Sequence, residues 1–404
     1  MRILHTSDWH FGRSLHGQDL SDSRTAFGRW LLDTVEEHAI DLVLVSGDIY
    51  DRAIPSVSHL NEVMNLLHEL STVTKVLLTP GNHDSATRLG AYSQFLRGNV
   101  QVCARIDEIG TAREFSGPGG DPGVLIYPVP YLEPDLVRGF LAEGTQPLAR
   151  THQAVMDAAL RRIGRDLLAR RKDGDLRPAV VMAHAFIVGA SPSDSERNIE
   201  VGGVPSISAS TFDTFGGLDL LPSPALSYVA LGHLHRPQRV LGSLVPMRYS
   251  GSPIAYSFSE APGEKSAVVI EITGGETGTV PCVNLVTVDI PSAHPLVVLR
   301  GCMDDLLHEA QRTDADAYVS LTITDDARPQ AMVSRLRAVF PHALSIIHSP
   351  EHAPILNAPR VHLESVDLNS TLADFFHQAG GQEISKEERA IITHVLDAAK
   401  ETNS

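Results

Sequence analysis

The sequence contains RILHTSDWH (residues 2–10), DLVLVSGDIYD (41–51) and KVLLTPGNHD (75–84), three apolar runs that each end in polar side chains. Runs of this length and composition are typical of buried strands. Between them, apolar residues recur at helical spacing from Thr25 to Ala39 and from Ser56 to Leu70. The order strand, helix, strand, helix, strand predicts βαβ units and a largely parallel sheet, so we expect an α/β fold.

Further strands are predicted beyond this region. A helix from Gln153 to Ala169 leads into AVVMAHA (179–185), and LSYVALGHLH (226–235) is another strand. From about Gly242 the runs are shorter and are separated by Gly-rich turns: MRYSGSP (247–253), AVVIEIT (267–273) and VNLVTVDI (283–290). These three runs predict a second sheet that packs against the first.

A small α/β domain is predicted after Pro291. Three strand-like runs alternate there with helical patterns near Met303 to Arg312 and Pro329 to Phe340; the runs are PLVVLRG (295–301), YVSLTIT (318–324) and ALSIIHS (343–349). We therefore divide the chain into residues 1–290, 291–355 and 356–404.

The C-terminal segment reads as two helices separated by Gly380-Gly381. The second begins with a capping box, Ser385-x-x-Glu388. It then carries an apolar face made by Ile391, Ile392, Val395, Leu396 and Ala399. This face either packs on its own domain or docks a partner, and the pattern leaves both alternatives open.

The composition of the 404 residues is that of a globular protein, with 43% hydrophobic and 20% charged residues. A formal net charge of −16 argues against a grip on nucleic acid by the whole surface. DNA binding would need a bound metal, a local basic patch or a partner. Three distant cysteines make no disulfide framework, no apolar run reaches the ~18 residues of a membrane span, and no signal peptide is recognisable. We expect a cytoplasmic protein.

Polar side chains that can bind metals follow five of the predicted strands: Asp8 and His10; Asp48; Asn82, His83 and Asp84; His184; and His233 and His235. Parallel strands bring their carboxyl ends to one edge of a sheet, so these side chains should converge on one crevice. Imidazole, carboxylate and amide oxygen suit Mn²⁺, Fe²⁺ or Zn²⁺. Any one of these histidines alone is more often structural than a ligand, but the whole set predicts a metal site. Seven ligands drawn from these nine side chains would fit two ions that share a carboxylate, and Asp48, on the central strand, is the natural bridge.

The motifs DWH, GDIYD, GNHD, AHA and GHLH resemble the five signature blocks of the calcineurin-like metallophosphoesterases. This resemblance implies a β-sandwich flanked by helices. Four longer blocks resemble the SbcD-type nuclease subunits of bacterial SbcCD exonucleases: GDIYDRAIPS (47–56), SPSDSERNIEVGG (191–203), YVALGHLHRPQ (228–238) and YSGSPIAYSFSE (249–260). The likeness is strong from Met1 to about Phe258 and extends to the C-terminal part only in layout.

The resemblance implies a role for each site residue. One ion would take Asp8, His10, Asp48 and His235, and the other would take Asp48, Asn82, His184 and His233, both most commonly Mn²⁺ in the family. His83 would be the catalytic histidine, and Asp84 would either orient His83 or cap a turn. Arg13 and His16 resemble DNA-facing positions, although they could be ordinary loop residues. Asp51 stands where archaeal and eukaryotic relatives tend to carry a second histidine, and its role stays open.

The resemblance also implies substrates and partners. The expected activities are hairpin cleavage, 3′→5′ double-strand exonuclease and single-strand endonuclease, in DNA repair, recombination and replication. Residues 291–355 would cap the active site and position DNA. Residues 356–404 would dock on the coiled coil of an SbcC-type ABC ATPase. This chain has no GxxxxGK[ST] motif, so the ATPase must be supplied by another chain. A homodimer within a heterotetramer, associated with the nucleoid and not with a membrane, is expected.

Two other kinds of protein remain as alternatives. A phosphatase or cyclic-nucleotide phosphodiesterase of the same superfamily would use the same metals without the capping domain and tail helices. A non-catalytic scaffold should have lost some ligands, and none is missing from this sequence.

Overall fold

The computed structural model describes residues 1–91, 98–196, 206–218, 225–261, 263–273, 282–351 and 385. The chain divides into two units, Met1–Pro350 and Glu351–Ser404. Only Glu351 and Ser385 of the second unit are among the described residues, so the predicted tail helices and the capping box lie outside them. The division into three domains therefore stays a prediction.

The first unit is built around two six-stranded sheets. The first sheet has the order β14 (Cys282–Ile290), β13 (Lys265–Thr273), β1 (Arg2–Thr6), β4 (Leu42–Ser46), β5 (Lys75–Thr79) and β6 (Val100–Val102). Strands β1, β4, β5 and β6 are parallel, as predicted. Strand β13 is antiparallel to β1, and β14 is antiparallel to β13. The prediction that AVVIEIT and VNLVTVDI belong to a second sheet is wrong. Both extend the first sheet, because β13 pairs with the free edge of β1.

The second sheet has the order β11 (Gln238–Val240), β12 (Met247–Tyr249), β10 (Tyr228–Gly232), β9 (Ala179–His184), β8 (Val124–Val129) and β7 (Arg113–Phe115). Its four central strands are parallel, and its two edge strands are antiparallel to their neighbours. The predicted strands AVVMAHA and LSYVALGHLH therefore lie in this sheet and not beside β1 and β4.

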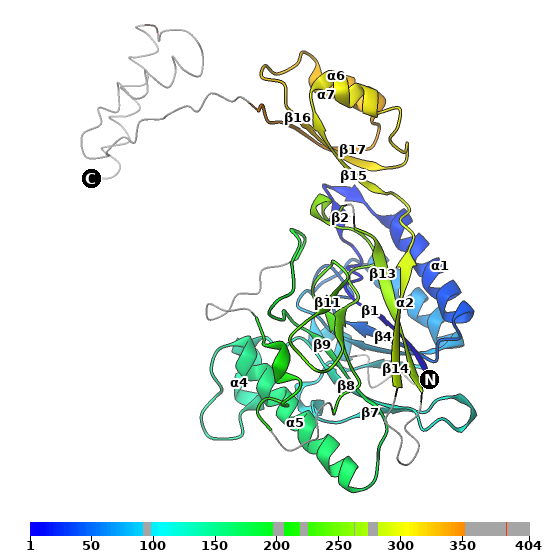
Figure 1. The fold of residues 1–404 in the computed structure, drawn as a ribbon, viewed down its shortest axis with the longest axis vertical. Coiled ribbons are helices and arrows are strands. Elements are labelled where there is room, and N and C mark those ends of the chain that lie inside the picture. The colour runs from blue at the N-terminus through cyan, green and yellow to red at the C-terminus, as the bar shows by residue number, and fades with distance from the viewer. Residues whose placement is uncertain are drawn as a thin grey trace, which may run out of the picture. The chain divides into compact units, whose positions relative to one another are not determined.

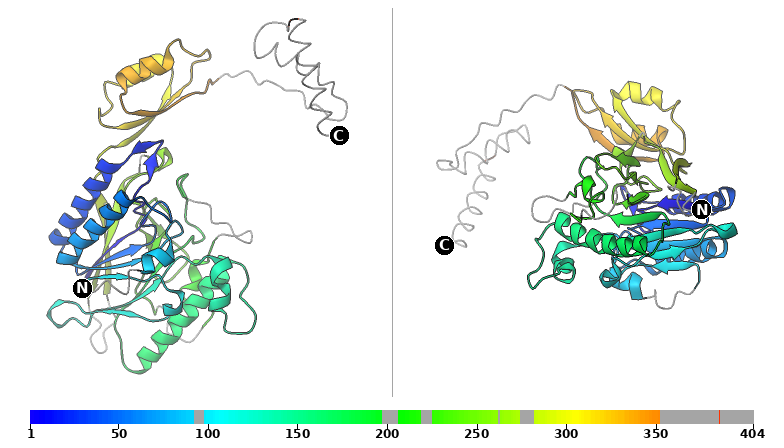
Figure 2. Two further views of the ribbon diagram at one scale, coloured as in Figure 1. Left: turned by 180° about the vertical axis from the view of Figure 1, so that it is seen from behind. Right: turned by 60° about the horizontal axis from the view of Figure 1, so that its bottom comes forward.

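Helices cover the outer face of each sheet and complete four layers. Helices α1 (Ser21–Glu37) and α2 (Val57–Val73) share a core with the first sheet, and α4 (Pro134–Leu141) and α5 (His152–Lys172) share one with the second. A third apolar cluster lies between the two sheets. Figures 1 and 2 show the two pairs of helices on opposite sides of the strands. This is the predicted β-sandwich flanked by helices.

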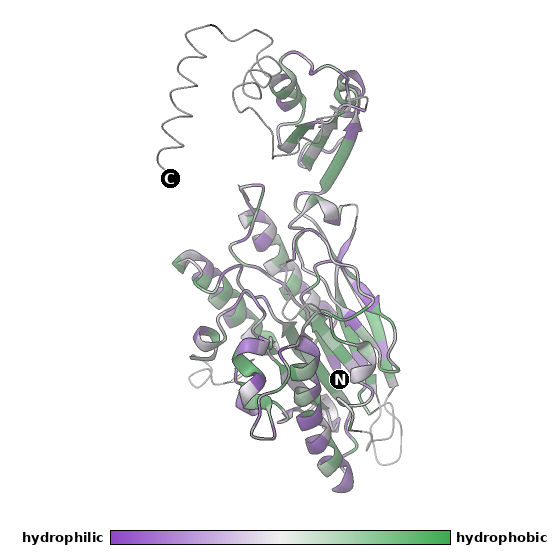
Figure 3. Cartoon of the chain, turned by 90° about the vertical axis from the view of Figure 1, so that its left-hand side faces the viewer, coloured by the Kyte–Doolittle hydropathy of each residue, from purple (hydrophilic) through white to green (hydrophobic). Residues whose placement is uncertain are grey.

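Strand β4 shows why the sequence folds in this way. All five of its residues are buried. Val43 and Val45 join the cluster under α1 and α2, while Leu42 and Leu44 join the cluster between the sheets. A strand covered on both faces needs an unbroken apolar run, and the strands are correspondingly hydrophobic in Figure 3, whereas the helices are mixed. Within the described residues no helix is long and apolar enough to cross a membrane.

The helices predicted before residue 351 are confirmed to within a few residues. Ser56 caps α2 by accepting a hydrogen bond from the backbone N–H of His59, and Thr151 caps α5 by accepting one from Ala154. Short elements fill the connections: β2 (Ser14–Leu15), β3 (Gln18–Asp19), α3 (Ala86–Ala91) and the 3₁₀ turns Ile106–Glu108, Pro118–Gly120, Ala209–Thr211 and Phe258–Glu260.

A small parallel sheet follows β14, as predicted. It consists of β15 (Leu296–Gly301), β16 (Tyr318–Ile323) and β17 (Ala343–His348), joined by α6 (Met303–Glu309) and α7 (Met332–Val339). The two helices and the sheet enclose their own apolar core, in which Leu321, Ile323 and Leu336 are fully buried. Tyr318 also packs with Leu15 and Tyr256 in a separate cluster.

Candidate metal centre

The candidate ligands lie at the carboxyl ends of strands from both sheets. The first sheet supplies side chains just after β1, β4 and β5, and the second supplies side chains at the ends of β9 and β10. Convergence on one crevice is confirmed, but its placement at one edge of a single sheet is wrong, because two sheets meet there. Six of the seven predicted ligands are 0–4% exposed: Asp8, His10, Asp48, His184, His233 and His235.

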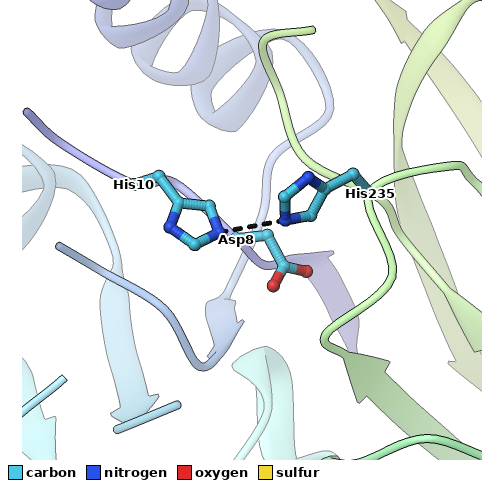
Figure 4. Close-up of side chains that lie close together, drawn as sticks. All are labelled: Asp8, His10 and His235. Atoms are coloured by element: carbon cyan, nitrogen blue, oxygen red, sulfur yellow. Dashed lines mark hydrogen bonds between the residues drawn. The ribbon is translucent and has the colours of Figure 1, made fainter. Parts of the chain in front are cut away.

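Asp8, His10 and His235 form the first group. One ligand atom from each lies within 4.8 Å of the others. The two Nε2 atoms of His10 and His235 face each other at 3.0 Å, as the dashed line in Figure 4 shows. These are three of the four side chains predicted to share an ion.

Asp48 links the first group to a second. Its Oδ2 lies 3.5 Å from His10 Nε2 and 3.4 Å from His184 Nε2. Asn82 Oδ1 lies 2.9 Å from His184 Nε2 and 3.2 Å from His233 Nδ1. Asp48 is therefore in reach of both groups, which is the position required of a bridging carboxylate.

The electrostatics of the site favour a bound cation. Burial raises the pKa of Asp8 to about 7. Burial alone would also raise the pKa of Asp48, but the imidazoles of His184 and His10 hold it well below its usual range. Among the described residues, the ion-pair partners of these two carboxylates are histidines and not Lys or Arg. Two carboxylates buried without a permanent positive charge, together with imidazole and amide donors, fit divalent cations.

Three of the four candidate imidazole ligands, those of His10, His233 and His235, are held in the neutral form. Burial lowers the pKa of His10 and of His235 well below the usual range, and it lowers that of His233 to about 3. Burial would do the same at His184, but the Asp48 and Asp8 carboxylates raise its pKa to about 9. A neutral ring offers the lone pair that a metal needs, and a cation near the carboxylates would take over the role that the His184 proton has here.

Backbone strain marks the same residues. Asp8, His10, Asp48 and His233 have φ values of 56°, 44°, 52° and 110°. Non-glycine residues rarely adopt this left-handed region, and such strain persists where the surrounding structure holds it. Four of the seven candidate ligands thus have an unfavourable backbone conformation. No sequence pattern indicated this.

His83 lies beside His10 and Asp48, with ligand atoms of the three within 4.8 Å of one another, at the more open side of the site. Its side chain is 14% exposed, against 0% for His10 and His184. Its Nδ1 lies 2.8 Å from the backbone oxygen of Asp51, and its backbone N–H donates to Asp48 Oδ1 at 2.8 Å. The Asp51 carboxylate is 3.9 Å from the same ring nitrogen. Asp51 therefore holds the His83 ring through its own backbone.

Asp84 binds backbone amides. Its carboxylate accepts hydrogen bonds from Gly81, Ile49 and Tyr50 at 2.9–3.0 Å. Of the two roles foreseen for Asp84, these contacts are those of the turn cap: the carboxylate fixes the loop that carries His83 and joins it to the loop that carries Asp48.

The two predicted DNA-facing residues differ in their surroundings. Arg13 donates to the backbone oxygen of Ser195, lies 5.1 Å over the ring of Tyr256 and is 3.8 Å from Asp51, with 18% of its side chain exposed. Arg13 is thus largely engaged within the chain. His16 is exposed, and its ring lies 5.4 Å from that of Phe258. Contact of either residue with DNA stays a prediction.

Sequence reasoning missed the groups that surround the ligands. Ser195 and Glu196 hold His235, and Glu260 and Lys265 lie behind them. Gly232, on the second sheet, has no side chain to overlap the backbone oxygen of Ser46 on the first sheet. The quoted blocks SPSDSE and YSFSE contained three of these residues, but nothing in the sequence connected them with GHLH.

Two family matches together cover most of the chain. Residues 1–237 match the family described as calcineurin-like phosphoesterase. Residues 292–379 match the family described as type 5 capsule protein repressor C-terminal domain. The first match covers more than half of the chain and includes every residue of the metal centre.

Curated proteins and solved structures are also similar. The D subunit of the nuclease SbcCD from Escherichia coli (strain K12) is 29% identical over 339 residues, which cover 81% of this chain and 78% of that protein. The corresponding SbcCD nuclease component of Bacillus subtilis (strain 168) is 29% identical over 397 residues, covering 96% and 95%. A crystal structure of a dimetal phosphatase from Danio rerio matches 70% of this chain and 98% of that chain, with 14% identity and a TM-score of 0.41.

Proposed function

The chain belongs to the calcineurin-like phosphoesterase family, and we propose that within this family it is the nuclease subunit of an SbcCD-type complex. The observation that carries the proposal is the convergence of all seven candidate ligands, six of them buried, in a chain that aligns over almost its whole length with the D subunit of an SbcCD nuclease. The reaction is the metal-dependent hydrolysis of phosphodiester bonds in DNA.

The proposed cofactor is a pair of Mn²⁺ ions. The first would be held by Asp8, His10, Asp48 and His235, and the second by Asp48, Asn82, His184 and His233. The cluster of Asp8, His10 and His235, the contacts of Asn82 with His184 and His233, and the position of Asp48 within reach of both His10 and His184 support this assignment. When bound, such a pair supplies Lewis-acid activation of a water molecule and neutralises charge on a phosphate.

His83 is the proposed catalytic residue. Because its Nδ1 is engaged by the Asp51 carbonyl oxygen, Nε2 is the ring nitrogen left to interact with a phosphate. From there the imidazole stabilises charge on the phosphate or gives a proton to the leaving oxygen. The Asp84 carboxylate accepts hydrogen bonds from three backbone amides and so keeps the loop that carries His83 in place. Asp84 therefore acts by positioning His83.

The proposed substrates are DNA hairpins, duplex ends degraded 3′→5′ and single strands cut internally, in repair, recombination and replication. The names of the curated relatives support a nuclease. Residues 291–355 would cap the site and position DNA, with Arg13 and His16 as candidate contacts. The acidic net charge of −16 supports a partner that supplies much of the DNA-binding surface.

The proposed partners are an SbcC-type ABC ATPase and a second copy of this chain. Residues 356–404 would dock on the coiled coil of the ATPase, which acts with the nuclease at the nucleoid in the cytoplasm. A homodimer within a heterotetramer is supported by an exposed apolar face of α2. Val57, Leu60 and Met64 lie along that face and are 73%, 36% and 49% exposed.

Cleavage of an end-labelled DNA hairpin in Mn²⁺ tests the function. Wild type, His83→Ala and His38→Gln are compared, each with and without the ATPase partner. His38 ends α1, at the opposite end of the sheet from the metal centre, so it controls for loss of a histidine as such. We expect cleavage by wild type and His38→Gln, and a loss of at least about 100-fold in His83→Ala.

A phosphomonoester and a cyclic nucleotide serve as competing substrates. If the DNA stays intact while either of these is hydrolysed, the chain is a phosphatase or a cyclic-nucleotide phosphodiesterase and the proposal is wrong. If no substrate is hydrolysed even with the ATPase partner and Mn²⁺, the chain is a scaffold.

A further inference from the structure

A chain of buried polar side chains leads from the metal ligand His235 into the protein. His235 Nδ1 lies 2.7 Å from Ser195 Oγ, and Ser195 Oγ lies 2.7 Å from Glu260 Oε1. Glu260 Oε2 forms an ion pair with Lys265 Nζ. The exposed fractions of these four residues are 1%, 5%, 3% and 7%. A buried polar group without a hydrogen-bond partner destabilises the fold, whereas a fully hydrogen-bonded network holds its side chains in one geometry.

The hydrogens of this chain can be placed by counting donors. Lys265 Nζ has three N–H donors and three acceptors: Glu260, the backbone oxygen of His235 at 2.8 Å and Ser252 Oγ at 2.9 Å. Glu260 is therefore the carboxylate of an ion pair and accepts at both oxygens. Ser195 has one O–H, and a carboxylate is its strongest neighbouring acceptor.

The hydrogen in the bond between Ser195 Oγ and His235 Nδ1 must then come from His235. With its own O–H given to Glu260, Ser195 Oγ can only accept from His235. The nearby hydroxyl of Ser193 donates to Glu196 Oε2, so it has no second hydrogen to offer. His235 must carry its proton on Nδ1, which leaves the lone pair of Nε2 pointing at His10 Nε2 and the ligand group.

We propose that Ser195 is a positioning residue for the metal centre: backed by Glu260 and Lys265, it locks His235 in the tautomer whose Nε2 binds a cation. The proposal rests on the proposed metal-dependent function. Glu196 adds a second restraint, because its Oε1 accepts from the backbone N–H of His235 at 2.7 Å. Adjacent residues of one loop thus hold both the ring and the backbone of the ligand.

His184 shows the same requirement met in another way. Its Nδ1 lies 2.9 Å from the backbone oxygen of Ser46, which also leaves Nε2 for a cation. A backbone carbonyl accepts without help. A serine hydroxyl can donate or accept. The carboxylate of Glu260 is therefore needed to take the Ser195 hydrogen, so that Ser195 accepts the hydrogen bond from His235.

The tautomer can be read without metal or nucleic acid. ¹⁵N-histidine is incorporated into the metal-free protein, His235→Gln identifies the resonances, and the ¹⁵N shifts show which ring nitrogen is protonated. We expect the Nδ1–H form in wild type and a mixed population in Ser195→Ala. Ser266→Ala is the matched control, because Ser266 is similarly buried, at 6% exposure, and lies on β13 outside the His235 relay.

Mn²⁺ affinity is the second measurement, followed by the electron paramagnetic resonance signal of free Mn²⁺. One of two sites should weaken by about 10–100-fold in Ser195→Ala and recover in Ser195→Thr, while Ser266→Ala binds as wild type does. If Ser195→Ala does not fold, the nearly isosteric Ser195→Cys replaces it, with the same expectation, because a thiol is a weak hydrogen-bond partner.

Two results would overturn the proposal: an unchanged His235 tautomer, or unchanged Mn²⁺ affinity at both sites, in a folded Ser195 variant. Neither measurement depends on DNA cleavage. The relay can therefore fail while the chain is a nuclease, and the nuclease assay can fail while the relay holds.

Discussion

Gly232 lies where the two sheets approach each other, and Gly232→Ala should displace the candidate ligand His184. A Cβ at this position would overlap the backbone oxygen of Ser46 and would lie 2.9 Å from its carbon and 3.0 Å from His184 Nδ1. These are the two groups joined by the hydrogen bond that orients His184. The added methyl group must therefore push them apart or force the sheets to separate.

The magnitude follows from these contacts. Overpacking of a dense interior costs about 1–3 kcal/mol. Leaving a buried hydrogen-bonding group without its partner costs about 1–3 kcal/mol more. We expect the free energy of unfolding to fall by about 2–6 kcal/mol. A ligand displaced by roughly 1 Å should reduce cleavage about 100-fold, and loss of the bond that orients His184 should weaken Mn²⁺ binding about 10–100-fold.

Thermal unfolding of the metal-free protein, Mn²⁺ titration and hairpin cleavage measure the three effects separately. Gly139→Ala is the matched control: Gly139 is exposed on α4, an added Cβ has no neighbour within 4 Å, and alanine is the better helix former. Full Mn²⁺ affinity and cleavage in Gly232→Ala would refute the reasoning, since the sheets could then separate without moving the ligands.

Three other outcomes are expected. Mn²⁺ at about 100 times its dissociation constant should stabilise the protein by about 2.7 kcal/mol; Asp48→Asn should lose most of this gain, and equal thermal shifts in both proteins would exclude Asp48 as the bridge. Asp84→Ala removes the acceptor of three backbone amides, so denaturant titration should show that the free energy of unfolding falls by about 2–4 kcal/mol. If Asp84→Ala destabilises the protein less than Asp84→Asn does, Asp84 is not a turn cap. Thr151→Ala removes the N-cap of α5 and should cost about 1 kcal/mol in thermal unfolding while leaving cleavage at the wild-type level.

The convergence of the candidate ligands could be predicted from the sequence because each follows the end of a strand. Asp8, Asp48 and His184 each follow an apolar strand, and the carboxyl ends of parallel strands must lie close together. The pairing of strands was harder to predict. The residues of β13 are almost all buried, as in any central strand, and nothing in such a run says which neighbour it joins. Its partner is decided by the open edge of β1, more than 250 residues earlier.

The residues that hydrogen-bond to the candidate ligands could not be predicted, for a related reason. Ser195 meets His235 across 40 positions and Glu260 across 65. Contacts of this range depend on the completed fold and leave no periodic pattern. Arg13 illustrates the same limit: the resemblance to a known family placed it facing DNA, whereas its hydrogen bond to the backbone oxygen of Ser195 depends on how the two loops pack.

The pairing of β1 with β13 has a consequence for synthesis on the ribosome. The first strand of the chain emerges early, but the strand that covers its second edge begins only at Lys265. At about 5–20 residues per second, that edge waits roughly 13–50 s for its partner. An unpaired apolar edge is a template for pairing between nascent chains. Slower initiation, lower growth temperature or more chaperone should therefore raise the yield of full-length protein, and products truncated before Lys265 should aggregate.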